Sequence, residues 1–456
     1  MKRYVLSVCL LLIAACSSEE TTRLDTPDIV LPPMKTFART APTPPRYSNA
    51  QLARDFLDLT FTLENGEAVP VFTRFEGPIT VRVLGDAPQT LGPDLDRLLQ
   101  RLRREAGLDI SRVAANQDAT ITVEPMPRRQ IRRVAPAAAC FVRPNVSSWA
   151  EYRQRRSDPT TFWNRLSERR SMAVFLPNDV SPQEIRDCLH EEIAQGLGPV
   201  NDIFRLATSI FNDDNFHAVL TGYDMMMLRV TYDRQLRSGL SRQQVAQRVP
   251  GILARINPRG GAGDIAPPAV QLGAWNRTIA QAISPRGSDA RKLAAARRAV
   301  GLAAAAGPTD TRLAFSYYVL GRQTLSSDPA AAMKAFLTAG TIYQNRRDSA
   351  LQEAHVALQV AAFQLSAGQA AIAQQLIDQN LRTVQRAEHA SLLSLMLLVK
   401  AEALELQSRP AEAAKIRRDA LGYGRYGFGA SSEVRERAAE ILAISPRSRR
   451  TSEGPI

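Results

Sequence analysis

Histidine is scarce in this chain. Of 456 residues only four are histidine, and His190 and His217 are the only two within residues 50–245. A zinc site with three histidine ligands is therefore excluded there. The sequence has no C-x-x-C pair and no glycine-rich phosphate-binding loop, so two further kinds of site are not indicated. After residue 15 no apolar run approaches the roughly 20 residues that a membrane-spanning helix needs.

The first residues predict export and attachment to lipid. Lys2 and Arg3 precede an apolar run at 5–15 that is too short to cross a bilayer and is typical of a secretory signal. The Ile-Ala-Ala-Cys sequence that ends at Cys16 resembles a bacterial lipobox, which implies cleavage before Cys16 and acyl chains, palmitate among them, on that residue. Ser17 favours the outer membrane, with the protein facing the periplasm. An ordinary signal peptide with a chance cysteine is the alternative.

Lysine is scarce as well, and arginine carries most of the positive charge. Six lysines are present, while the formal net charge is +13. Such a charge permits binding to nucleic acid, but an exported protein rarely meets it, so we expect no nucleic-acid partner. Anionic lipid, lipopolysaccharide or acidic cell-wall polymer are the expected counter-ions. An arginine-rich proteome would explain the same composition without any ligand.

Few cysteines remain once the signal is removed and Cys16 is lipidated. Cys140 and Cys188 are an even pair in an oxidising compartment, which predicts one disulfide. On the chain-entropy model, a loop of about fifty residues closed in this way is stabilised by roughly 4 kcal/mol. Two separate buried thiols are the alternative.

The first half of the chain carries strand patterns. Apolar and polar residues alternate at 56–64 and 70–76 around Asn65-Gly66, which is typical of a hairpin. Further strands are expected at 77–85, 119–127, 138–144 and 171–180.

Helix signals are interleaved with these strands. Leucines at helical spacing predict a helix over 94–108 that ends at Gly107. Ser181, with Pro182 after it and Glu184 three residues on, predicts the start of a second helix. Residues 50–245 are therefore expected to form an α+β domain.

The second half is alanine-rich and repetitive. Four expected helix starts align at Ala290, Ala330, Ala370 and Ala411, with spacings of 40, 40 and 41 residues. Paired helices at a fixed period predict an α-solenoid that binds protein surfaces. The pattern resembles tetratricopeptide repeats with lengthened helices. The match is only to the class of helical repeats, because the usual period of about 34 residues and the tryptophan of the tetratricopeptide pattern are missing. An irregular helical bundle is the alternative.

The segment DCLHEEIAQGLGPVND, at 187–202, has the spacing of a zinc-protease helix. It resembles the metzincin pattern H-E-x-x-H-x-x-G-x-x-H, in which residues four apart share a helix face and the glutamate activates a metal-bound water. Glu192 and Gly198 keep the glutamate and the turn glycine. Glu191, Gln195 and Asn201 stand where the three histidines would be. The frame that starts at His190 fails, because it puts alanine at the second ligand position.

Several interpretations of this motif remain open. Oxygen-bearing side chains suit calcium, magnesium or manganese better than zinc, so a divalent metal at Glu191, Gln195 and Asn201 is one possibility, although no cofactor is assured. A mixed site with His217 and an aspartate from 212–215 is another. A buried hydrogen-bond network that includes Glu192 and Gln195, and that ties the helix to the turn at Asp202, needs no metal.

The same residues resemble an uncharacterised proteobacterial lipoprotein family, "domain of unknown function 2927". The resemblance covers about residues 55–240 and rests on the motif positions Glu191, Glu192, Gln195, Leu197, Gly198, Asn201 and Asp202. It brings no established activity. Met225, Met226 and Met227 follow at a distance that suits a zincin methionine turn, with Met226 as its candidate, although core filling accounts for them equally.

The sequence therefore predicts a zincin-like α+β domain followed by an all-α, tetratricopeptide-like solenoid. The expected parts are a signal peptide at 1–15, lipidated Cys16 and a disordered tether at 16–49, the zincin-like domain at 50–245, a linker at 246–270, the repeats at 271–445 and a disordered tail at 446–456. We expect a lipid-anchored scaffold whose repeats bind an unidentified envelope protein. The alternative is an envelope peptidase or cell-wall amidase with Glu192 as general base.

Overall fold

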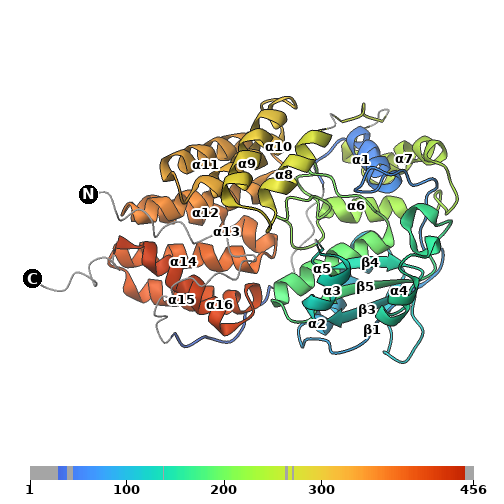
Figure 1. Cartoon of the computed structure of the whole chain (residues 1–456), viewed down its shortest axis with the longest axis horizontal. Helices are drawn as coiled ribbons and strands as arrows, with labels where there is room; N and C mark the ends of the chain where they lie inside the picture. The colour runs from blue at the N-terminus through green and yellow to red at the C-terminus, as the bar shows by residue number, and fades with distance from the viewer. Residues whose placement is uncertain (1–28, 38–44, 137, 262–264, 270–271, 447–456) are drawn as a thin grey trace, which may run out of the picture. The chain divides into compact units, whose positions relative to one another are not determined.

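The computed structural model describes residues 29–37, 45–136, 138–261, 265–269 and 272–446 (Figure 1). The chain divides into two compact units, residues 41–269 and residues 270–456 together with 1–40, and each is described here by itself. The predicted signal peptide, Cys16, much of the tether and residues 447–456 lie outside the described residues. Among the helices of the described residues, none is both long and apolar enough to cross a membrane.

The first unit, here called the α/β unit, is built on a five-stranded sheet. The strand order is β2-β1-β3-β5-β4, and only β4 runs antiparallel to its neighbour. The strands are β1 (Ile79–Val83), β2 (Ile110–Arg112), β3 (Ile121–Met126), β4 (Phe141–Pro144) and β5 (Met172–Pro177). The four strands predicted at 77–85, 119–127, 138–144 and 171–180 are confirmed, whereas β2 was missed because three residues carry too little pattern.

Helices cover both faces of this sheet. Apolar residues of α1 (Asn49–Phe61), α2 (Leu91–Arg101), α5 (Pro182–Leu197), α6 (Gly222–Thr231) and α7 (Arg242–Ile256) form one core with one face of the strands. Shorter α3 (Arg128–Val134) and α4 (Trp149–Arg155) pack on the other face, around Phe175. Every residue of β5 is buried, as expected of a strand covered on both sides.

The segment 56–64, predicted as a strand, instead ends a helix. Ser48 and Gln51 form a capping box that starts α1, and Leu52, Phe56 and Leu59 are buried at helical spacing. The predicted hairpin is reduced to one bridge between Thr62 and Ala68, with Gly66 at φ 86°. The second predicted strand, 70–76, keeps only a single bridge from Val71 to Ser241. The apolar residues at 56–61 fit the period of a strand as well as that of a helix, and packing against α7 favours the helix.

The two predicted helices of the α/β unit are present. The helix α2 continues as a π-helical turn, Leu102–Ala106, and ends at Gly107 in the left-handed conformation with φ 72°. The side chain of Ser181 accepts a hydrogen bond from the N–H of Glu184 at the start of α5. Residues 246–256, which the sequence placed in the linker, belong to α7 and pack on α1.

The second unit, here called the helical unit, is a succession of helices joined by short turns. They are α8 (Gly273–Ile283), α9 (Asp289–Ala304), α10 (Thr311–Thr324), α11 (Pro329–Gln344), α12 (Ala350–Ser366), α13 (Ala370–Arg386), α14 (Ala390–Leu406), α15 (Pro410–Gly427) and α16 (Ser431–Ile444). Each packs on the next, so the core runs along the series (Figure 1). The four helix starts predicted from the repeat are confirmed as those of α9, α11, α13 and α15.

Glycine allows two pairs of consecutive helices, α14 with α15 and α10 with α11, to pack closely. A Cβ atom added to Gly427 on α15 would lie 2.5 Å from the main-chain nitrogen of Ser391 on α14. A side chain at Gly321 on α10 would meet the ring of Phe336 on α11 at 2.6 Å. Glycine at these two positions is therefore a packing requirement of the repeat.

Candidate functional site

The helix α5, which carries the motif, is held at both ends. The pair Cys140–Cys188 forms the predicted disulfide and joins the segment before β4 to α5, with Cα atoms 6.0 Å apart. At the other end the Arg169 guanidinium donates to the main-chain oxygens of Gln195 and Gly196, both at 2.7 Å, and of Gly198 at 2.6 Å. Burial lowers the pKa of Arg169 to about 10, so it is still a cation at neutral pH. A cation at a helix C-terminus is favoured by the helix dipole.

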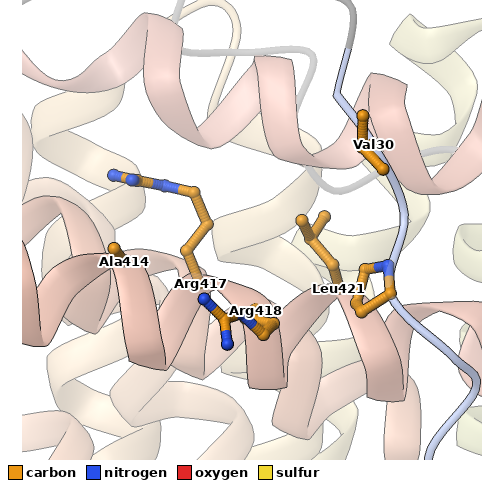
Figure 2. Close-up of a pocket in the computed structure, with 6 residues that line it drawn as sticks. Val30, Ala414, Arg417, Arg418 and Leu421 are labelled. Atoms are coloured by element: carbon orange, nitrogen blue, oxygen red, sulfur yellow. The ribbon is translucent and has the colours of Figure 1, made fainter.

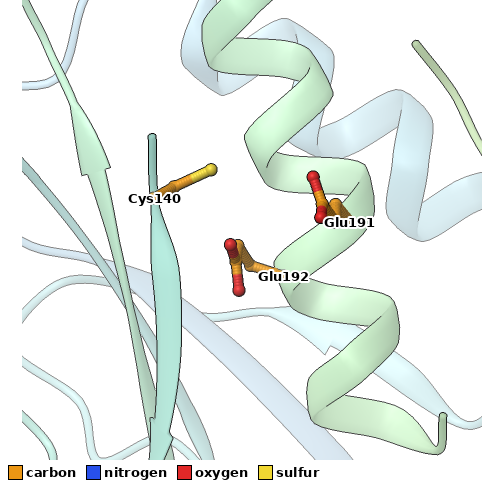
Figure 3. Close-up of side chains that lie close together, drawn as sticks. All are labelled: Cys140, Glu191 and Glu192. Atoms are coloured by element: carbon orange, nitrogen blue, oxygen red, sulfur yellow. The ribbon is translucent and has the colours of Figure 1, made fainter. Parts of the chain in front are cut away.

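Two glutamates of α5 and the sulfur of Cys140 lie close together (Figure 3). One ligand atom of each lies within 4.8 Å of the others. The sulfur is committed to the disulfide and cannot act as a thiolate ligand. The chemistry of this group therefore comes from the carboxyl groups of Glu191 and Glu192.

Glu192 is buried and only partly hydrogen-bonded. Its residue is 4% exposed, and it accepts a hydrogen bond from the main chain of Val142. Its Oε2 atom is buried and has no hydrogen-bond partner in the described part of the chain. Burial, followed by the charges of Glu191 and Glu64, holds the pKa of Glu192 well above its usual range. A raised pKa disfavours the carboxylate form of Glu192, which is the form that a general base needs.

More carboxyl groups surround this pair. Burial, then Glu64 and Asp213, raises the pKa of Glu191 to about 7. Burial, then Glu191, Glu64 and Asp213, raises the pKa of Asp202 well above its usual range. Asp213 is exposed at the surface of the loop, and partial desolvation together with Glu64 raises its pKa to about 6. We call Glu64, Glu191, Glu192, Asp202 and Asp213 the carboxylate cluster; it draws on the turn after α1, on α5 and on the loop between α5 and α6.

Of the three predicted ligand positions, Glu191 and Gln195 lie at the carboxylate cluster and Asn201 does not. Gln195 donates from Nε2 to Oδ2 of Asp202 at 3.2 Å, so it lies at the cluster together with Glu191. Asn201 donates from Nδ2 to the main-chain oxygen of Asp58 on α1 at 3.1 Å. No pattern in the sequence indicated Glu64, which follows α1, and Asp213 was only one of the acids considered at 212–215.

The two histidines of the α/β unit are engaged elsewhere. Nδ1 of His190 accepts the main-chain N–H of Leu220 at 3.1 Å, and burial holds the pKa of His190 well below its usual range. Nε2 of His217 lies 3.0 Å from the oxygen of Ala207, and burial lowers the pKa of His217 to about 4. Both are thus neutral at pH 7, and each uses a ring nitrogen to fix the loop before α6.

The remaining motif residues serve packing. Met225, Met226 and Met227 lie inside the helix α6 and are buried in its core, so they form no turn. A Cβ atom added to Gly198 would lie 2.9 Å from Oγ1 of Thr231, which accounts for glycine at the end of α5.

Residues 49–251 match the family described as "Protein of unknown function (DUF2927)". The match covers nearly all of the α/β unit that the structure describes and includes the whole carboxylate cluster. No curated protein and no solved structure matches the chain. The α/β unit is therefore similar to an uncharacterised domain, and its chemistry has to be argued from its own residues.

Proposed function

We propose that the chain is a lipid-anchored scaffold of the cell envelope whose helical unit binds an extended peptide segment of a partner protein. The single observation that carries this proposal is the position of residues 29–37, here called the strap. The strap lies along α15 and α16 of the same unit. On this proposal the unit is a tetratricopeptide-like solenoid, and the α/β unit is a zincin-like domain without protease ligands.

The strap is held mainly through its main chain. The Lys35 N–H donates to the oxygen of Gly422 at 2.9 Å. Arg425 donates to the oxygen of Pro32 at 3.0 Å, and Arg435 to the oxygen of Ile29 at 3.1 Å. Main-chain oxygens are present in any peptide, so this mode of binding is not restricted to the strap sequence.

Side chains fix the register of the strap. Nζ of Lys35 lies 2.5 Å from Oδ1 of Asp419, and the ring of Phe37 stacks on Tyr423 with centroids 5.3 Å apart. These contacts concern the end of the strap nearest to Phe37. The other end, which includes Val30 and Pro32, is held by the two arginines alone.

Space remains between that end of the strap and α15. A cavity of about 380 Å³ is lined by Val30, Pro32, Ala414, Arg417, Arg418 and Leu421 (Figure 2). Val30 is 86% exposed, so the strap leaves apolar surface uncovered. Arg417 is paired with Glu402 and Glu405, whereas no ion pair of Arg418 occurs among the described residues. The cavity thus suits an extended peptide that places an apolar side chain between Val30 and Leu421 and an acidic one beside Arg418.

The alternative function, an envelope hydrolase, makes a different demand. It requires Glu192 to be ionised and in reach of a substrate, whereas Glu192 is 4% exposed with a raised pKa. Glu192→Gln separates the two functions, because a scaffold keeps its partner and its cellular role in this variant and a hydrolase with Glu192 as base does not.

The test uses a photo-crosslinking amino acid at position 418 of the full chain in cells. We expect one discrete adduct, and we expect Ala414→Trp, which fills the cavity from an exposed position, to remove it. Ala331→Trp, at an exposed alanine of α11, is the matched control and should leave the adduct in place. An adduct that survives Ala414→Trp, or the absence of any adduct, would overturn the proposal.

A further inference from the structure

We propose that the carboxylate cluster binds one divalent cation of the oxygen-preferring class, with calcium as the best-fitting ion. Glu191 and Glu192, whose oxygens lie within 4.8 Å of each other, would supply ligands from α5. Asp202 would supply a further ligand from the loop after α5, and the exposed residues Glu64 and Asp213 would stand at the solvent side. This ligand set differs from the one that the metzincin spacing predicted, because Glu192 becomes a ligand and Asn201 has no part. The inference concerns the α/β unit and is independent of the peptide-binding proposal.

The first support is that the cluster has no basic partner. None of its five carboxyl groups forms an ion pair with lysine or arginine anywhere in the described residues. This occurs in a chain with a net charge of +13, in which nearby acids such as Asp55 and Asp58 do pair with an arginine, Arg205. Of these groups Glu192 is buried, Glu191 and Asp202 are half-buried, and Glu64 and Asp213 are exposed. Neighbouring carboxylates without a counter-charge repel one another, and a bound cation would relieve that repulsion.

The second support is independent of charge and concerns hydrogen bonding. Oε2 of Glu192 and Oδ1 of Asp202 are both buried, and neither has a hydrogen-bond partner in the part of the chain that the structure describes. The Glu192 residue is 4% exposed, and its carboxyl group extends from α5 toward the strand that follows Cys140, with Glu191 beside it on the helix (Figure 3). Buried polar atoms are nearly always satisfied, so the unpartnered oxygen of Glu192 beside Glu191 indicates a missing ligand. The Asp202 oxygen is a second unsatisfied acceptor, on the loop after α5.

The spacing and the kind of atoms select the ion. Oxygens of Glu191 and Glu192 lie within 4.8 Å of each other, a separation that two ligands on one calcium ion can have at bond lengths of about 2.3–2.6 Å. The nitrogen and sulfur ligands that zinc prefers are engaged: His190 by Leu220, His217 by Ala207 and Cys140 by its disulfide. A ligand set of oxygens alone, partly on an irregular loop, suits the flexible coordination of calcium.

The candidate ligands come from separate segments of the chain. Glu191 and Glu192 are on α5, which the disulfide and Arg169 hold in place. Asp202 and Asp213 are on the loop between α5 and α6, and Gln195 of α5 donates a hydrogen bond to Asp202. A bound cation would therefore join the loop and the turn at Glu64 to the fixed helix.

The experiment is calorimetric titration of the soluble chain from Ser17 onward, purified with chelator and then freed of it. With calcium chloride we expect about one equivalent to bind and the melting temperature of the α/β unit to rise by about 3 °C or more. Asp202→Asn should weaken calcium binding by at least about tenfold. Asp96→Asn, which removes an exposed carboxylate of α2 outside the cluster, is the matched control and should bind as the natural chain does.

Glu191→Gln is the second variant, because it changes a half-buried residue on a fixed helix and should fold even where Asp202→Asn does not. It should weaken calcium binding to a similar extent. The inference is overturned if neither calcium nor magnesium binds the natural chain at millimolar concentration, if zinc binds in preference to both, or if Asp96→Asn lowers the affinity as much as the cluster variants do. None of these outcomes bears on the crosslink from position 418.

Discussion

The guanidinium of Arg169 is hydrogen-bonded to the main-chain oxygen of Gln195, with an N–O distance of 2.7 Å. The same buried side chain reaches Gly196, Gly198 and the hydroxyl of Thr73. One residue outside the motif thus satisfies three carbonyl groups at the end of α5 that would otherwise lack partners. The position of every acidic side chain on the last turns of α5 depends on it.

Removing this cap should cost more stability than any surface change nearby. We expect Arg169→Met to lower the free energy of unfolding of the α/β unit by about 3 kcal/mol, because buried carbonyl oxygens lose charged donors. Arg170→Met is the control, since the Arg170 side chain is 80% exposed and should matter by less than about 0.5 kcal/mol. Urea unfolding followed by circular dichroism measures both, and equal effects would contradict the role given to Arg169.

His217 should make stability depend on pH. Its pKa is lowered to about 4 in the folded chain, mainly by burial, whereas an unfolded histidine titrates near 6.5. Between these values the unfolded chain binds more protons, so this group's contribution to stability is complete above pH 6.5 and is lost as the pH falls toward 4.

The variant His217→Gln keeps a donor for the oxygen of Ala207 and removes the titration. Relative to it, the natural chain should lose about 2 kcal/mol of stability between pH 7.5 and 4.5. Unfolding curves of both proteins at the two pH values give this difference, in which other titrating groups cancel. A difference that does not change with pH would show that His217 is free to protonate in the folded state.

The disulfide should be a main contributor to the stability of the α/β unit. The bond closes a loop between residues 48 apart, so the double variant Cys140→Ser with Cys188→Ser should be less stable by about 4 kcal/mol. The natural chain under reducing conditions provides the comparison and should approach the double variant. A loss below about 1 kcal/mol would mean that the unfolded chain is already compact in this region.

Two glycines of the helical unit should respond in opposite directions to alanine. Gly427→Ala places a Cβ atom against the main chain of Ser391, so α14 and α15 must move apart at a cost of about 1–3 kcal/mol. Gly301, inside α9, has nothing within 4 Å of the added atom, and Gly301→Ala should stabilise by about 0.5–1 kcal/mol. Melting temperatures of the two variants test this, and a shared sign would contradict the close crossing.

Local signals made much of the fold predictable. Ser181 and Pro182 marked the start of α5, Gly107 marked an end, and the even pair Cys140 and Cys188 predicted the disulfide. The strand predicted over 56–64 failed because the same apolar residues fit a helix. The signal that identifies the helix is the capping box of Ser48 and Gln51. It lies before residues 56–64, the segment predicted as a strand.

The candidate site was predictable only in part, because it is made by distant segments. Glu191 and Glu192 could be placed on one helix from the motif alone. Glu64 and Asp213 join them through the turn after α1 and the loop after α5, and no period in the sequence connects those segments. Arg169 was missed for the same reason, since a single arginine between strands carries no pattern.

The strap also shortens the length of chain between the proposed lipid anchor and the helical unit. On the proposed lipidation of Cys16, the chain between Cys16 and Ile29, and not the whole tether, limits how far α15 can stand from the bilayer. Thirteen peptide steps span at most about 45 Å. The cavity beside Val30 would then reach only the part of the periplasm that lies next to the membrane. Its peptide partner would be drawn from proteins that expose an extended segment within that layer.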